Sequence, residues 1–152
     1  MNLHSFLREG REEILAEATA SVKRAGLEHY EKAGTELIHQ RLDDLLSLAI
    51  TAIAERNLAP MVAHANAIAL ERFEGGVDLA EVQTAFNVLE EVIWVRILKR
   101  VPGPEQAEAL GLIGTVLGAG KDTLARKYVS LATKTHAPSL DLAALFAGTE
   151  GV

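Results

Sequence analysis

The chain contains no cysteine and has no excess of basic residues. Its 152 residues include 15 lysines and arginines against 21 aspartates and glutamates, a formal net charge of −6 at pH 7. The absence of cysteine excludes disulfides, thiolate metal ligands and thiol catalysis, and it fits a reducing cytoplasm. The absence of a basic stripe argues against a nucleic-acid partner, because binding to phosphates depends on clustered lysine and arginine side chains.

Long apolar runs are also missing. The longest uncharged, apolar-rich stretches cover residues 45–54 and 109–120, well short of the roughly 20 residues that span a bilayer. Arg8 and Glu9 interrupt the N-terminus before the apolar core of a signal peptide could form. We therefore expect a cytoplasmic protein that neither crosses nor binds a membrane.

Apolar residues spaced three and four apart dominate the chain, whereas strand-like alternation is absent. With 49% apolar residues, this pattern predicts one folded all-α domain over residues 1–137, followed by a short tail over residues 138–152. The domain is expected to be a helical bundle of about five main helices. These helices are predicted at about residues 3–25, 35–56, 60–73, 78–100 and 105–135.

Local signals mark several ends of these helices. Gly26 and the pair Gly75–Gly76 follow two predicted helices, where glycine commonly provides the C-terminal cap. Pro60 suits the first turn of the next helix, because its missing amide hydrogen is not needed there. Asp78 with Glu81 three residues later resembles a capping box.

The helix predicted at residues 78–100 is apolar on two faces. One face consists of Leu79, Val82, Phe86, Leu89, Ile93 and Ile97, and the other of Ala85, Val88, Val92 and Val95. A helix of this kind is either central or part of an interface. Because soluble monomers rarely expose large apolar patches, we expect a homodimer. The expected dimer or partner surface comprises Val88, Val92 and Val95 together with Leu142, Leu145 and Phe146 of the tail.

Three glycines share one face of the last predicted helix, namely Gly111, Gly114 and Gly118. Each costs about 1 kcal/mol relative to alanine inside a helix, so another interaction must offset the cost. Close packing against the alanine-rich helix at residues 60–73 or against a partner subunit is the favoured explanation. The alternative is a pocket lined by Phe86, Trp94, Gly114 and Gly118.

Chemical motifs are weak throughout. Glu36 and His39 have the spacing of a di-iron ligand pair, but the second such pair is missing. The segment at residues 118–123 lacks the first glycine and the hydroxyl residue of a phosphate loop. His64 stands between Ala63 and Ala65, without the bulky apolar neighbours of a haem ligand. We therefore expect no catalytic, cofactor-binding or metal-binding residues and no enzymatic activity.

A family resemblance covers roughly residues 3–132. The residues that carry it are Phe6, Leu7, Ile14 and Leu15 near the start, and later Phe73, Gly76, Leu79, Glu81, Val82, Phe86, Leu89 and Ile93. In these positions the chain resembles the N-terminal sensor domain of RsbR-type stressosome proteins. Where that family often has a tryptophan in its first helix, this chain has Ala18.

The resemblance implies an all-helical, globin-like domain without haem, commonly dimeric, that receives a signal and passes it to an output domain. No output domain follows Thr135, so we expect contact with a separate, unidentified regulatory protein, unless the chain is part of a longer one. The expected function is a non-enzymatic sensory module, in bacterial stress signalling by this resemblance. The alternative is a small-ligand or haem-binding helical sensor or carrier, with its pocket between the last two helices.

Overall fold

The computed structural model describes residues 2–135, and within this range the regular structure is entirely helical. The predicted all-α class is confirmed. The described residues form seven helices, so the expectation of about five is wrong. They are α1 (Leu3–Glu9), α2 (Arg11–Arg24), α3 (Glu28–Ala33), α4 (Thr35–Glu55), α5 (Ala59–Glu74), α6 (Leu79–Arg100) and α7 (Gly103–Thr135). The predicted tail, with Leu142, Leu145 and Phe146, lies outside the described residues.

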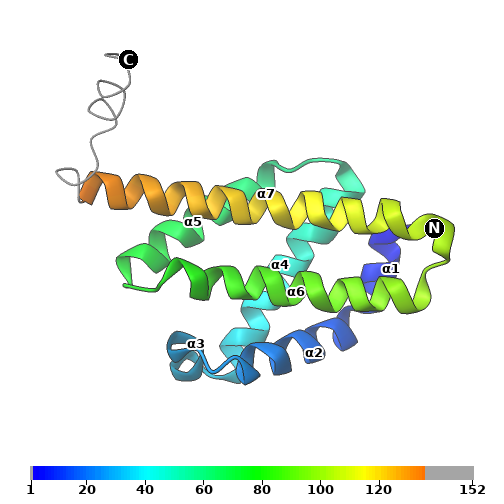
Figure 1. Cartoon of the computed structure of the whole chain (residues 1–152), viewed down its shortest axis with the longest axis horizontal. Coiled ribbons are helices and arrows are strands. Elements are labelled where there is room, and N and C mark those ends of the chain that lie inside the picture. The colour runs from blue at the N-terminus through cyan, green and yellow to red at the C-terminus, as the bar shows by residue number, and fades with distance from the viewer. Residues whose placement is uncertain (1, 136–152) are drawn as a thin grey trace, which may run out of the picture.

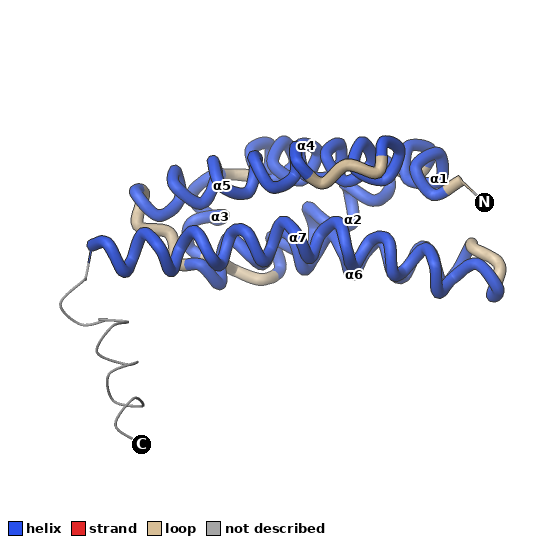
Figure 2. The backbone as a smooth tube through the Cα atoms, turned by 90° about the horizontal axis from the view of Figure 1, so that it is seen from above, coloured by secondary structure: helices blue, strands red, loops and turns tan. Residues whose placement is uncertain are grey.

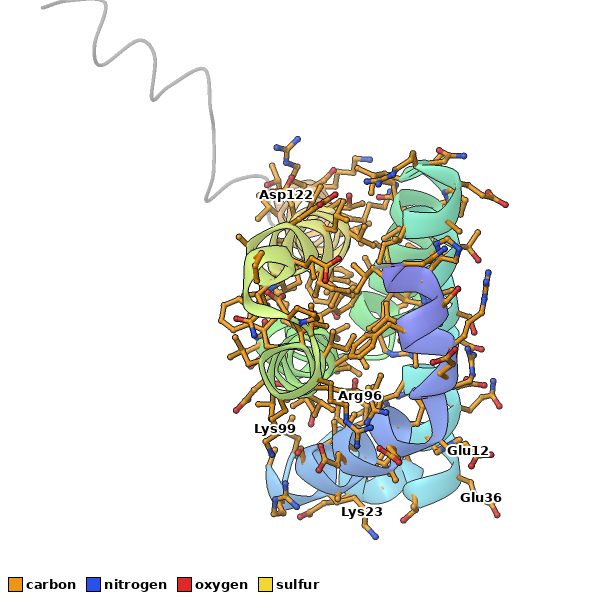
Figure 3. The ribbon with its side chains drawn as sticks, turned by 90° about the vertical axis from the view of Figure 1, so that its right-hand side faces the viewer. Glu12, Lys23, Glu36, Arg96, Lys99 and Asp122 are labelled. Atoms are coloured by element: carbon orange, nitrogen blue, oxygen red, sulfur yellow. The ribbon has the colours of Figure 1, made fainter. Side chains whose placement is uncertain are left out.

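The first additional helix arises because Gly10 separates α1 from α2. A Cβ atom at Gly10 would lie 2.7 Å from Cζ of Arg96, which is closer than real contacts allow. The missing side chain thus lets the Arg96 guanidinium lie at the break, where it pairs with Glu13 and sits 5.8 Å from the ring centroid of Phe6. Figure 3 shows Arg96 directed from α6 toward this corner. A contact between such distant residues leaves no periodic signal in the sequence.

The second additional helix is the short α3, whose first turn is capped from α6. The backbone amide of His29 donates a hydrogen bond to Oε1 of Glu81 over 2.9 Å. Asp78 occupies the N-cap position of α6 but makes no side-chain capping bond. The predicted capping box is therefore wrong, because Glu81 satisfies an otherwise unpaired amide of another helix.

The helices form two sides of the molecule. Figure 1 shows α6 and α7 running antiparallel beside each other, and Figure 2 shows them on the side opposite α1, α4 and α5. Helix α5 packs on α7, while α2 packs against both α4 and α6. At 33 residues, α7 is the longest of the described helices.

The core lies between these two sides. Most of the apolar side chains of α4 are buried, although Leu37 is 40% exposed. The predicted inner face of α6 is also buried, except for the partly exposed Leu79. Within this core Gly120 of α7 lies very close to other side chains, since a Cβ atom there would be 2.6 Å from Cε1 of Phe86 and 3.0 Å from Sδ of Met61. Ala65 and Ala69 of α5 are completely buried. Small residues therefore let α5 and α7 pack tightly around the Phe86 ring.

Candidate functional site

The outer side of α6 carries a cluster of exposed apolar side chains. Trp94 is 44% exposed, Val95 40% and Leu98 53%. Because residues three and four apart lie on one side of a helix, these three form a continuous ridge. We call Trp94, Val95 and Leu98 the apolar ridge. Leu98 is absent from the predicted partner surface. It could have been predicted, because it lies four residues after Trp94 and three after Val95, on the same side of the helix.

A strip of three glycines on α7 lies at the same level as the apolar ridge. Two sets of hydrogen bonds fix α6 and α7 relative to each other. Lys121 donates to Glu90 over 2.9 Å, and Gln106 donates to the carbonyl oxygen of Val101 over 3.0 Å. Because the helices are antiparallel, residues 111–118 of α7 lie between these anchors at the level of the α6 segment from Glu90 to Val101, which includes Trp94.

The glycine strip, defined as Gly111, Gly114 and Gly118, is open. A Cβ atom at any of these positions would have no atom of another helix within 4 Å. The expectation that these glycines pack against the alanine-rich helix α5 is therefore wrong. The reason is that α7 turns a different face toward α5, with Ile113, Leu117, Gly120 and Leu124 buried. A partner subunit or a ligand on the glycine strip stays a prediction.

The structure also places the other residues of the predicted surface and pocket. Val92 is only 8% exposed within the single chain, in a helix against which α2 packs, whereas Val95 is exposed and Val88 is partly buried. Phe86 is 1% exposed and lines a cavity between α4, α5 and α6. Trp94 is 44% exposed and does not line this cavity, so the structure separates these two members of the predicted pocket.

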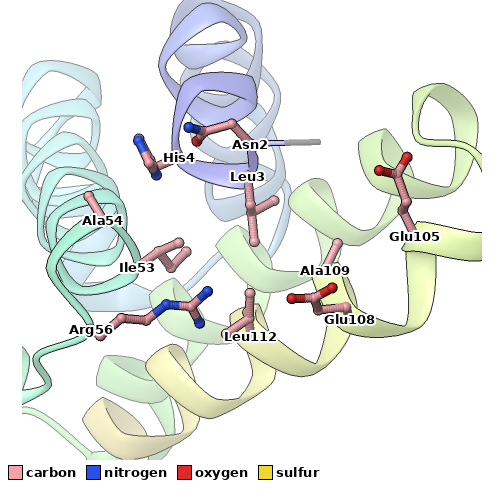
Figure 4. Close-up of a pocket in the computed structure, with 10 residues that line it drawn as sticks. All are labelled: Asn2, Leu3, His4, Ile53, Ala54, Arg56, Glu105, Glu108, Ala109 and Leu112. Carbon is pink, nitrogen blue, oxygen red and sulfur yellow. The ribbon is translucent and has the colours of Figure 1, made fainter.

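A cleft of about 310 Å³ opens between α1, α4 and α7 (Figure 4). Its polar lining includes His4, Arg56, Glu105 and Glu108, and its apolar lining includes Leu112. Arg56 ends α4 in the left-handed conformation, with φ of 53°. Charges of both signs therefore share the lining of this cleft.

The predicted metal and haem motifs have these positions in the fold. Glu36 and His39 are exposed, and residues 2–135 contain no cluster of three or more histidine, aspartate or glutamate side chains suited to a metal ion. His64 is half-buried in the wall of the cavity between α4, α5 and α6. Burial lowers the pKa of His64, which Asp44 raises and Arg72 lowers further. A neutral imidazole is therefore favoured there.

None of the helices in the described range has the length and hydropathy to cross a membrane. The family model described as the RsbT co-antagonist protein rsbRD N-terminal domain matches residues 9–138. No curated protein and no solved structure matches the chain, so the globin-like arrangement stays a prediction. The match extends over most of the 152 residues. The chain therefore belongs to the rsbRD N-terminal domain family, a family of regulatory domains in stress signalling.

Proposed function

We propose that this chain is a non-enzymatic sensory module that passes a stress signal on by protein contact, through the outer surface of α6 and α7. The observation that carries the proposal is the exposed apolar ridge beside the open glycine strip. Apolar side chains gathered at one place on a soluble domain mark a contact surface more often than scattered ones do. The family match supports the signalling role.

We propose that a second copy of the chain occupies this surface. A two-fold interface uses the same patch on both subunits, so the patch must be complementary to itself. The apolar ridge protrudes from α6, and the adjacent glycine strip offers α7 backbone without side chains. A two-fold axis between the two helices would seat each ridge on the glycine strip of the partner. Charged residues such as Lys99 and Asp122 would then lie at the rim (Figure 3).

Further partners follow from the family name. RsbT co-antagonist proteins are regulators, and we propose that other stressosome proteins receive the signal from this module. A homodimer and such a partner are compatible, because the dimer would leave the surfaces of α4 and α5 free.

The single tryptophan of the chain allows a direct test. Trp94 lies in the apolar ridge and is the only tryptophan present, so its fluorescence reports on this surface alone. We expect its emission maximum to shift to shorter wavelength with rising concentration, in parallel with a doubling of mass in sedimentation.

Leu98→Glu should abolish both changes while leaving the helical circular dichroism intact. The matched control is Leu70→Glu, which places the same charge at a position on α5 that is 41% exposed. A wild-type monomer with unshifted emission at roughly tens of micromolar would contradict the proposed interface.

A further inference from the structure

The cavity between α4, α5 and α6 differs from the cleft of Figure 4 in how its charges are arranged. Its volume is about 280 Å³, and side chains of all three helices and of Tyr30 line it. An apolar cavity of about 150 Å³ holds one benzene molecule, so this space suits a ring or short chain with one polar group. It lies away from the apolar ridge.

Arg72 places a guanidinium deep in this cavity wall. Its side chain is 9% exposed, yet its ion-pair partner Glu71 is 71% exposed. The positive charge is therefore buried while its carboxylate stays in solvent. A charge buried without a fully desolvated partner is costly, and a bound anion would reduce that cost.

Arg41 adds a second guanidinium to the same wall. It donates to Nε2 of His29 over 2.9 Å and lies 5.9 Å from the ring centroid of Tyr30. Within residues 2–135 no carboxylate lies within 4 Å of its nitrogens. Burial and then the charge of Arg72 lower the pKa of Arg41. The exposed carboxylate of Glu71, which is ion-paired with Arg72, raises the pKa of Arg41 and offsets only part of the effect of the Arg72 charge.

The acidic groups of the cavity lie at its solvent edge. Asp44 is exposed and accepts a hydrogen bond from the side-chain amide of Gln40 over 2.9 Å. The side chain of Glu71 is 71% exposed. Deeper in, the wall is apolar, with Leu45, Val82 and Phe86 buried. The cavity therefore combines an inner cationic group with apolar surface.

We propose that the cavity between α4, α5 and α6 binds a small organic carboxylate, held by Arg41 and Arg72 with its apolar body against Ile68 and Phe86. The planar fork of a guanidinium matches the two oxygens of a carboxylate. The neutral imidazole of His64 supplies a further hydrogen bond at the cavity wall. Since Val82, Ala85 and Phe86 belong to α6, the ligand would contact the helix that carries the apolar ridge.

Titration of the full chain with benzoate tests the proposal, with thermal unfolding and calorimetry as readouts. Benzoate should raise the unfolding midpoint in a saturable way, whereas benzamide, of nearly the same shape and without charge, should not. Inorganic phosphate should be a poor substitute, because it lacks an apolar body.

Arg41→Gln should weaken benzoate binding by about tenfold or more, since a charge-assisted pair is lost. Arg41→Lys keeps the positive charge but loses the two parallel donors of the guanidinium, so it should bind benzoate with intermediate affinity. If Arg41→Gln does not fold, the lysine variant tests whether Arg41 binds benzoate. The matched control is Arg24→Gln, which removes an exposed arginine that donates to Ser21 and should bind as wild type does.

Four results would overturn the proposal. They are equal binding of benzamide, equal binding of phosphate, unchanged binding by a folded Arg41 variant, and no binding of benzoate, hexanoate or phenylacetate up to about 10 mM. The inference does not rest on dimer formation. If the chain dimerises but does not bind carboxylates, only the proposed carboxylate site is refuted. If it binds carboxylates but stays monomeric, only the proposed interface is refuted.

Discussion

The two faces of α7 carry glycine in opposite surroundings. On the inner face, Gly120 has no room for even a methyl group, because the Phe86 ring and the Met61 sulfur occupy that space. On the outer face, Gly114 and Gly118 have open space. The same residue thus marks close packing on one face and an open surface on the other. A strip of small residues in a sequence indicates a helix face without showing what covers it.

Helix α6 repeats the contrast with aromatic side chains. Phe86 is 1% exposed and Trp94 is 44% exposed, although both belong to apolar stretches of one helix. The inner residue holds the domain together, while the outer one contributes contact surface. The same kind of substitution should therefore change the free energy of unfolding by different amounts on the two faces.

The largest effect is expected from Phe86→Ala. Removing a fully buried phenylalanine leaves a cavity and should lower the free energy of unfolding by about 3–5 kcal/mol. Trp94→Ala on the outer face should cost much less, because nearly half of the side chain is already in water. Urea unfolding of both variants at low concentration measures the difference. Similar losses for the two would break the proposed division between inner and outer faces.

Gly120→Ala should be the next most damaging change. The added methyl group must displace the buried ring of Phe86, and overpacking of this kind costs about 1–3 kcal/mol. Thermal unfolding should show a lowered midpoint. An unchanged or raised midpoint would mean that the Phe86 ring moves aside easily, so that α5 and α7 pack less tightly than described.

Gly114→Ala is expected to have the smallest effect, and in the opposite direction. Its methyl group meets open space, and alanine favours the helix over glycine by about 0.5–1 kcal/mol. The unfolding midpoint should rise in dilute samples. If a second copy seats its apolar ridge on the glycine strip, association measured by sedimentation should weaken in the same variant. A lowered midpoint in dilute samples would place Gly114 in a packed interior.

Local signals predicted much of the fold. The long helix α4, the Gly75–Gly76 end of α5 and Pro60 in its first turn were readable because each depends on neighbours in sequence. Gly76 adopts φ of 73°, as a glycine after a helix commonly does. By contrast, the break at Gly10 depends on Arg96, and the capping of α3 depends on Glu81. Such contacts join distant segments and have no periodic pattern.

The candidate sites were predictable to a smaller extent for the same reason. The spacing in α6 indicated a second apolar face, but not that Val92 would be buried within the chain or that Trp94 would be exposed. Arg41 and Arg72 lie on different helices and look like ordinary surface residues in the sequence. Only the packing of α4 against α5 brings both into one cavity wall.

The length of α7 gives it the properties of a mechanical lever. At a rise of 1.5 Å per residue, its 33 residues extend for about 50 Å, against about 33 Å for the 22 residues of α6. The end of α7 near Thr135 lies beyond the beginning of α6 in Figure 1. A rotation of about 5° around its other end would displace Thr135 by about 4 Å at this length. Gly120, about 25 Å along the same helix, would move by about 2 Å. Displacement of the end of α7 is therefore coupled to repacking around Phe86 in the core.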